Sequence, residues 1–153
     1  MQDQDNDQST PRIVVGVDSS ECSKTALRWA IGQAQLTGAT VEAVAAWQDP
    51  PAMYGYSYGW APPVVEGDGI QALTEKTLAD TVAGVAGPDS PPGQVTTSVV
   101  QGHPAQVLMN AAAGAQMLVV GSRGHGTFAG IVLGSVSQHC VQHAPCPVTV
   151  IPQ

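Results

Sequence analysis

The chain has 153 residues, of which 43% are hydrophobic and 11% charged, and its formal net charge is −7. This length suits a single domain whose core is large enough to fold without metals or cross-links. The five basic residues form no cluster against twelve acidic ones, which argues against binding to nucleic acid or to an anionic membrane surface. The apolar runs are far shorter than the roughly 20 residues of a membrane helix.

Residues 1–11 begin "MQDQDNDQST" and predict a disordered N-terminal tail, because they are polar and acidic. They lack the basic start and apolar middle of a secretory signal, so we expect a cytoplasmic protein. The cysteines Cys22, Cys140 and Cys146 are odd in number and have no CxxC spacing. They are therefore expected to be small buried or half-buried thiols, and not a disulfide framework or a zinc site.

Strands and helices alternate in the first third of the chain. The β-branched run "RIVVGVD", from Arg12, predicts a strand that is buried on both faces. The following residues predict a helix that is capped by Ser19 and Ser20 and stopped by Gly38. A second strand is predicted for "TVEAVAAW", residues 40–47.

Residues 50–69 contain four prolines, four glycines and all three tyrosines, a mixture that predicts a long loop. Its aromatic segment 54–60, "YGYSYGW", has two interpretations. It forms a lid or a partner-binding surface, because clustered Tyr and Trp are favoured at interfaces, or it is a connector lying on the surface.

The alternation resumes after this loop. The predicted elements are a helix at 70–87, a strand at 94–102, a helix at 104–114, a strand at 116–121, a short helix at 135–143 and a strand at 146–151. A βαβαβαβαβ order with strands apolar on both faces is typical of a single α/β domain. We therefore predict a Rossmann-like, doubly wound open sheet of five mainly parallel strands in the order 3-2-1-4-5.

In such sheets, ligands bind beyond the carboxyl ends of the strands. The predicted order places "GVDSS" (16–20) opposite "VGSRGHG" (120–126), with the end of the second strand beside them. Gly121 and Gly124 can adopt conformations closed to other residues and so turn N–H groups toward an anion. A helix that begins at Gly134 and Ser135 adds free N–H groups, and Ser135 and Ser137 add hydroxyls. The pattern predicts a phosphate site made mainly of backbone donors.

Three side chains near this site each have two interpretations. Arg123 is the only lysine or arginine after Lys76, and it either pairs with a polyphosphate or is a solvated surface residue. His125 either donates to a phosphate oxygen or is an ordinary loop residue. Asp18 either accepts from a ribose hydroxyl, or helps to hold Mg²⁺ through water, or caps the first helix; these roles are compatible.

Neither a P-loop nor a GxGxxG after the first strand is present. The spacing Gly121-x2-Gly124-x9-Gly134-Ser135 stands between "LVV" and "PVTVI". Together, "IVVGVDSSECSKTALRWA" and "MLVVGSRGHGTFAGIVLGSVSQHCVQHAPCPVTVI" resemble the universal stress proteins over residues 12–151. In that family this spacing marks the ATP-binding members. One departure is that Ser19 replaces the glycine of the usual "DGS".

The resemblance implies a nucleotide-binding domain at residues 12–153 that binds ATP as its magnesium complex, without direct side-chain ligation of the metal. Asp18 would contact the ribose or the metal ion, and the backbone at Ala46 would contact the adenine. It also implies a homodimer that pairs its last strands, which fits an apolar edge strand. The expected site comprises Gly16, Val17, Asp18, Ser19, Ala46, Val120, Gly121, Ser122, Arg123, Gly124, His125, Gly126, Gly134, Ser135, Val136 and Ser137.

Three functions remain open at this point. The first is a regulatory, stress-adaptation protein whose conformation or partner binding depends on ATP occupancy. The second is a slow ATPase or phosphotransferase with Ser122, Thr127 or Ser135 as the acceptor. The third is an interaction module with a vestigial pocket. No P-loop lysine is present, so efficient hydrolysis is not expected.

Overall fold

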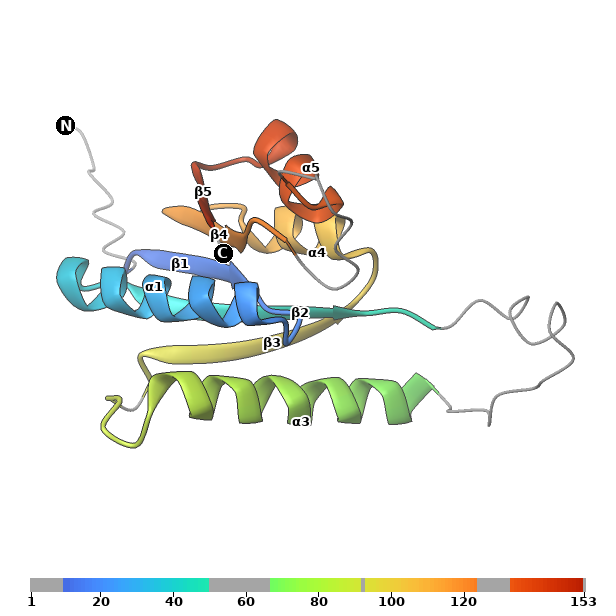
Figure 1. Cartoon of the computed structure of the whole chain (residues 1–153), viewed down its shortest axis with the longest axis horizontal. Coiled ribbons are helices and arrows are strands. Elements are labelled where there is room, and N and C mark those ends of the chain that lie inside the picture. Colours follow the sequence, from blue (N-terminus) through green and yellow to red (C-terminus); the bar gives the residue numbers. More distant parts are fainter. Residues whose placement is uncertain (1–9, 50–66, 92, 124–132, 153) are drawn as a thin grey trace, which may run out of the picture.

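The computed structural model describes residues 10–49, 67–91, 93–123 and 133–152. Its elements follow the predicted alternation of strands and helices (Figure 1). They are β1 (Arg12–Gly16), α1 (Glu21–Thr37), β2 (Thr40–Trp47), α3 (Gly67–Ala86), β3 (Val95–Gln101), α4 (Pro104–Ala111), β4 (Met117–Gly121), α5 (Ser135–His143) and β5 (Val148–Ile151).

The five strands form one parallel sheet in the order β3-β2-β1-β4-β5. Val15 of β1 lies beside Ala43 of β2 and Val119 of β4. The predicted α/β class, strand number and strand order are therefore confirmed. Because the strands are parallel, the ends of β1, β2 and β4 meet at one edge of the sheet.

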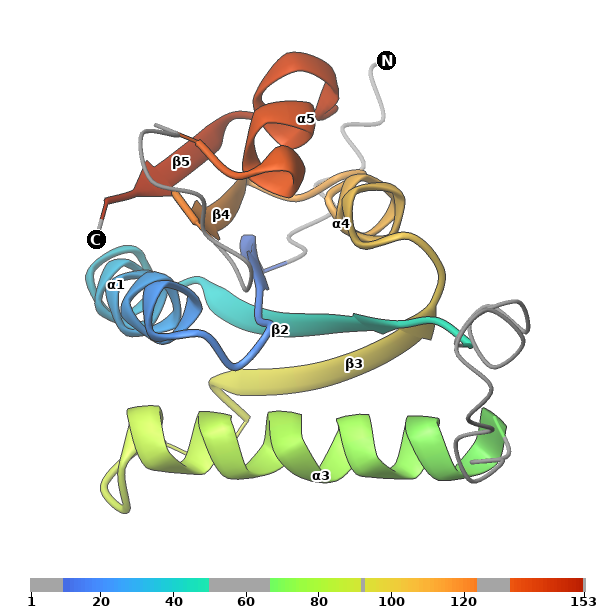
Figure 2. The same cartoon turned by 45° about the vertical axis from the view of Figure 1, so that its right-hand side comes forward.

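Helices cover both faces of this sheet (Figure 2). On one face, α1 packs mainly on β1 and β4 while α3 packs on β2 and β3, and the core between them includes Ile13 and Val15 of β1. On the other face, α4 packs on β1 and β2 while α5 packs on α4 and β5, and the core there includes the intervening Val14 of β1. Buried side chains on both faces explain why the strands are apolar at successive positions.

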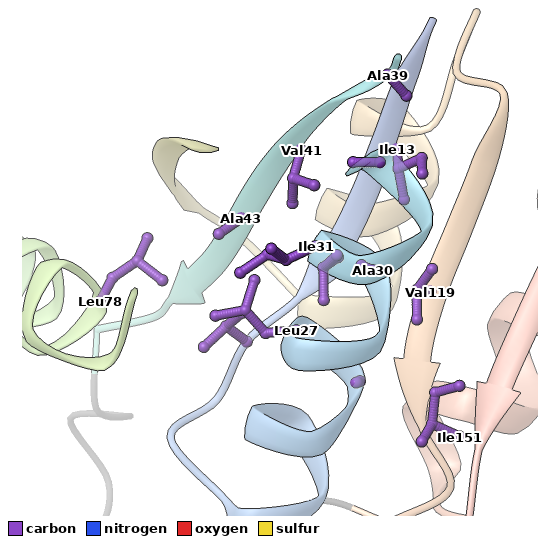
Figure 3. Close-up of a cluster of buried hydrophobic side chains, with 14 of the residues drawn as sticks. Ile13, Leu27, Ala30, Ile31, Ala39, Val41, Ala43, Leu78, Val119 and Ile151 are labelled. Carbon is purple, nitrogen blue, oxygen red and sulfur yellow. The ribbon is translucent and has the colours of Figure 1, made fainter. Parts of the chain in front are cut away.

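Helix α1 supplies the largest apolar contribution to the core on the face that it covers together with α3. Leu27, Ala30 and Ile31 recur at helical spacing and lie against β1, β2 and β4, while Leu78 reaches the same cluster from α3 (Figure 3). Ser20 caps the start of the helix, because its side chain accepts a hydrogen bond from the Ser23 N–H, and Gly38 ends it with φ of 75°. The predicted cap at Ser20 and the stop at Gly38 are confirmed, while a capping role of Ser19 stays a prediction.

Two predicted boundaries were wrong. Helix α3 begins at Gly67, inside the segment predicted as a loop up to residue 69. A glycine is tolerated at the start of a helix, so Gly67 and Gly69 do not break this one. Helix α4 ends at Ala111 and not near Gly114, although Gly114 has the left-handed φ of 75° expected after a helix.

The predicted tail, residues 1–11, lies outside the described residues except for Thr10 and Pro11. The Pro11 carbonyl accepts a hydrogen bond of 2.9 Å from the Thr40 N–H, so the chain joins the sheet by this residue. The aromatic segment 54–60 is also outside the described residues, and both interpretations of it stay predictions. Among the described helices, none has the length and apolar character required to span a bilayer.

Candidate functional site

The end of β1 leads into a tight turn before α1. The Val17 N–H donates to the Val44 carbonyl at 2.9 Å, which continues the pairing with β2 one residue beyond Gly16. Asp18 and Ser19 then turn the chain, and Ser20 starts the helix cap. The turn therefore places Asp18 at the sheet edge beside the end of β2, where Ala46 lies two residues past Val44.

The Asp18 carboxylate takes part in the capping of α1. Its Oδ1 atom accepts from the Ser20 backbone N–H at 3.0 Å and also from the Ser20 hydroxyl. The Asp18 N–H in turn donates to the Ser23 hydroxyl at 3.3 Å. Asp18 therefore orients Ser20, the N-cap residue of α1, while direct capping of the helix by Asp18 and its contact with ribose or metal stay predictions.

Ser19 has φ of 63° and is the one non-glycine residue with a positive φ in the described part of the chain. Left-handed backbone favours glycine, because the Cβ of other residues crowds the neighbouring carbonyl. This is the position at which "DSS" replaces the usual "DGS". The turn therefore keeps the backbone path that suits glycine, although a serine occupies it.

At the end of β4, Gly121 is required by packing. A Cβ atom on Gly121 would lie 2.9 Å from Cys22 Sγ and 3.0 Å from the carbonyl carbon and oxygen of Cys22. Its φ is not positive, so the expectation that Gly121 adopts a conformation closed to other residues was wrong. The glycine instead lets the first turn of α1 approach β4 closely.

Ser122 is 8% exposed and fixes the path that leaves β4. Its N–H donates to the Ile151 carbonyl at 2.9 Å, and its own carbonyl accepts from the Gly134 N–H at 2.7 Å. Cys22 Sγ lies 3.6 Å from the Ser122 hydroxyl. The start of α5 is therefore held directly against the end of β4.

Helix α5 begins after an N-cap residue that makes no side-chain cap hydrogen bond. Gly134 is the N-cap residue, with φ of −66° and ψ of 162° and without a side-chain cap hydrogen bond. The first N–H groups of a helix have no intrahelical partner, so those of Ser135, Val136 and Ser137 form a positive end. The buried Ser137 hydroxyl donates to the Gly121 carbonyl, so it ties α5 to β4. Its contact with a phosphate stays a prediction.

The structure brings most of the predicted site together. One edge of the sheet holds four of its segments: the turn at 16–20, Ala46, the end of β4 from Val120 to Ser122, and the start of α5. Arg123 follows them and is partly exposed. Gly124, His125 and Gly126 lie outside the described residues, and their roles stay predictions.

Sequence reasoning missed two residues at this edge. Cys22 lies beneath it, in contact with Gly121 and Ser122, and Ser23 orients the backbone of Asp18. The "ECSK" sequence offers no signal for either role, since both depend on the close approach of α1 to β4. The three thiols are free: Cys22 and Cys140 are buried and Cys146 is half-buried, as predicted.

These features define an α/β protein with an open parallel sheet and a polar, glycine-dependent edge at the ends of β1 and β4. The profile of the universal stress protein family matches residues 10–152. The chain is 36% identical over 154 residues to the universal stress protein Rv1996 of Mycobacterium tuberculosis. The chain therefore belongs to the universal stress protein family.

The match to Rv1996 covers 92% of this chain and 48% of the relative, so the chain spans about half of that protein's length. Among solved structures, the universal stress protein UspA from Lactobacillus plantarum superposes with a TM-score of 0.71 at 23% identity, over 92% of this chain and 97% of that one. This likeness supports the same fold.

Two further solved structures of similar fold contain nucleotides. One is a universal stress protein in complex with cAMP, with a TM-score of 0.57 at 23% identity, over 92% of this chain and 95% of that one. The other is the universal stress protein from Archaeoglobus fulgidus in complex with dAMP, with a TM-score of 0.53 at 19% identity, over 93% and 97%.

Proposed function

We propose that this chain is a regulatory protein that binds ATP at the edge formed by β1, β4 and α5. The observation that carries the proposal is the start of α5, where the N-cap residue Gly134 makes no side-chain cap hydrogen bond. The Gly134 N–H donates to the Ser122 carbonyl at 2.7 Å and so holds this start beside the end of β4. Helix N-termini bind phosphates through their N–H groups and their dipole. Nucleotide occupancy would act on the orientation of α5.

A phosphate site made of backbone N–H donors suits an acidic protein. With a net charge of −7, the chain repels anions at long range, so the attraction has to come from groups close to the ligand. The N–H groups of Ser135, Val136 and Ser137 and the side chain of Arg123 are such groups. Mg²⁺ would accompany the phosphates, with Asp18 acting through water, since the turn fixes its carboxylate near the edge.

An adenine nucleotide is the ligand class that the relatives favour, because cAMP and dAMP, bound in the two similar structures, both carry adenine and one phosphate. ATP is the proposed ligand of this chain, since the motif Gly121-x2-Gly124-x9-Gly134-Ser135 is complete. The backbone at Ala46 lies at the end of β2, where it could contact the base. We also propose a cytoplasmic location.

Calorimetric titration with ATP, ADP, AMP and cAMP tests the proposal, with Gly124→Asp as the disabling variant. A carboxylate at this glycine would repel the phosphates, so we expect ATP affinity to fall at least about tenfold. Gly84→Asp is the matched control, because a Cβ at Gly84 of α3 meets nothing within 4 Å. Equal ATP affinity of Gly124→Asp and the unmodified chain, or no ATP binding by the unmodified chain, would reject the site.

The competing enzymatic function is a slow ATPase or self-phosphorylating protein. The structure favours Ser135 over Ser122 as an acceptor, because Ser135 is exposed at the start of α5 whereas Ser122 is buried. Thr127 lies outside the described residues. Steady-state turnover above roughly 1 s⁻¹ would favour this alternative. Failure to bind any of the four nucleotides would instead favour an interaction module with a vestigial pocket.

We further propose a homodimer that forms through β5. This strand lies at one edge of the sheet and pairs with β4 alone in the described part of the chain. Its sequence "VTVI" is apolar or β-branched, and such an edge is normally covered. The segment 54–60 remains a proposed surface for a protein partner.

A further inference from the structure

A groove of about 610 Å³ lies between α4 and α5, away from the proposed nucleotide site. Gln106, Met109 and Asn110 of α4 line one side, and His139 and His143 of α5 line the other. None of the residues that line it belongs to the predicted nucleotide site. The groove therefore requires an explanation of its own.

His139 and His143 are separated by four positions on α5, so they lie on the same side of the helix, one turn apart. Their ring centroids are 4.8 Å apart and the ring planes are tilted by 49°. Both side chains are exposed. Two imidazole rings at this spacing can direct one nitrogen each toward a common ion.

The surroundings of the pair favour a cation. His143 is in the last turn of α5, where the unpaired carbonyl groups give the helix a negative end. No lysine or arginine is among the described residues that line the groove. The facing side chains are amides, with Gln106 Nε2 donating to Asn110 Oδ1 at 2.9 Å. Thus no fixed positive charge in this lining opposes an incoming metal ion.

We propose that His139 and His143 form a binding site for a divalent transition-metal ion of the Ni²⁺, Cu²⁺ and Zn²⁺ class. Imidazole is a preferred ligand of these ions, whereas Mg²⁺ and Ca²⁺ prefer oxygen. In the described part of the chain, histidine, cysteine and carboxylate side chains form no cluster of three or more. The ion is therefore held by two imidazoles and completes its coordination with water.

Such a site lies on the helix whose start forms one wall of the proposed nucleotide site. A metal ion that links residues one turn apart favours the helical conformation of that turn, because the ligands meet only when the turn is formed. The inference itself does not depend on nucleotide binding. It requires only that the two histidines bind a metal ion together.

Calorimetric titration of the untagged full chain with Ni²⁺ tests the proposal. We expect 1:1 binding that weakens at least about tenfold in His139→Gln and in His143→Gln, since each removes one of the two protein ligands. His103→Gln is the matched control, because His103 is an exposed histidine that makes no side-chain cap hydrogen bond on α4. Circular dichroism of each variant checks that it is folded.

A second measurement needs no substitution. Paramagnetic Ni²⁺ should broaden the amide NMR signals of residues 139–143 and of the facing α4 residues 106–110 before those of other elements. Unchanged affinity in either α5 variant, equal loss in His103→Gln, or broadening centred on another part of the chain would overturn the proposal.

Discussion

At the scale of single residues, Gly121 shows how a motif glycine can act through packing. Sequence reasoning assigned it a special backbone conformation, but the structure places it where a Cβ atom would meet the backbone of Cys22 at 3.0 Å. Backbone atoms cannot move aside as the end of a flexible side chain can. The glycine is therefore needed to bring α1 and β4 together beneath the site.

We predict that Gly121→Ala lowers the free energy of unfolding by about 1 to 3 kcal/mol, the usual range for overpacking a close contact. Urea denaturation of the nucleotide-free chain measures this change. Gly32→Ala in the middle of α1 is the matched control, since its Cβ would meet nothing within 4 Å. There the higher helix propensity of alanine should stabilise the chain by about 0.5 to 1 kcal/mol. Equal effects of the two substitutions would contradict the packing role of Gly121.

Residue-level predictions succeeded where the cause was local. Ser20 and Gly38 act as helix ends because capping depends on a few neighbouring residues. The contact of Cys22 with Ser122 joins residues 100 positions apart, and no pattern in the sequence encodes it. The Ser137 hydroxyl donates to the Gly121 carbonyl, a contact that the sequence did not predict, and its contact with a phosphate stays a prediction.

At the scale of elements, α5 links the sheet to both proposed binding sites. Its first residues contact the end of β4, its last turn carries His143, and Cys140 in its middle is buried in the core on the face that α4 and α5 cover. Burial raises the pKa of the Cys140 thiol, because the charged thiolate would lose its hydration there. Packing of α5 on the sheet therefore depends on a neutral thiol.

We predict that the chain loses stability as the pH rises above about 9.0, the usual pKa of the thiol in the unfolded chain. A raised pKa in the folded state means that the unfolded state releases its proton first, so ionisation favours unfolding. One such thiol contributes a slope of up to about 1.4 kcal/mol per pH unit until the folded-state pKa is reached. Urea denaturation between pH 7.5 and 10.5, with a reductant present, measures the slope.

Cys140→Ala should flatten this alkaline loss of stability relative to the unmodified chain. Cys146→Ala is the comparison, because burial also raises the Cys146 pKa but a backbone hydrogen bond with Leu118 and the charge of Arg12 oppose the rise. We expect a smaller change of slope in Cys146→Ala. The same alkaline slope in Cys140→Ala and the unmodified chain would show that α5 packing does not depend on this thiol.

The elements themselves could be predicted because each helix has its own apolar periodicity and each strand has its own run of apolar residues. Alternation of buried strands and amphipathic helices indicated the parallel sheet, and the strand order follows from the known preferences of such folds. Element ends and exposure were harder to predict. Leu73 fits the apolar period of α3 but is 64% exposed, whereas Leu78 of the same helix is buried against the sheet.

At the scale of the whole molecule, β3 and β5 are the two edge strands of the sheet in the part of the chain that the structure describes. The Pro147 carbonyl, just before β5, accepts from Leu118, and the Ile151 carbonyl accepts from Ser122, just after β4. The odd-numbered residues of β5 therefore face β4 in the alternation of a parallel pair. Val148 and Val150 therefore present their backbone N–H and C=O groups to the outer edge. In β3, the Gln94 carbonyl accepts from Val41 of β2, so Thr97 is one of the outward-facing residues there.

We predict that Val150→Pro converts a dimer into a monomer while leaving the fold intact. Proline removes the outward N–H of Val150, which a partner strand would need, and edge strands tolerate proline when the inward ladder is untouched. Thr97→Pro makes the matched change on β3 and should leave the dimer unchanged. Light scattering with size-exclusion chromatography reports the mass, and circular dichroism reports the fold. The proposal requires that only the β5 edge offers backbone N–H groups to a second copy. If the unmodified chain is a monomer at micromolar concentration, there is no such interface. If Thr97→Pro dissociates the dimer and Val150→Pro does not, the interface lies elsewhere.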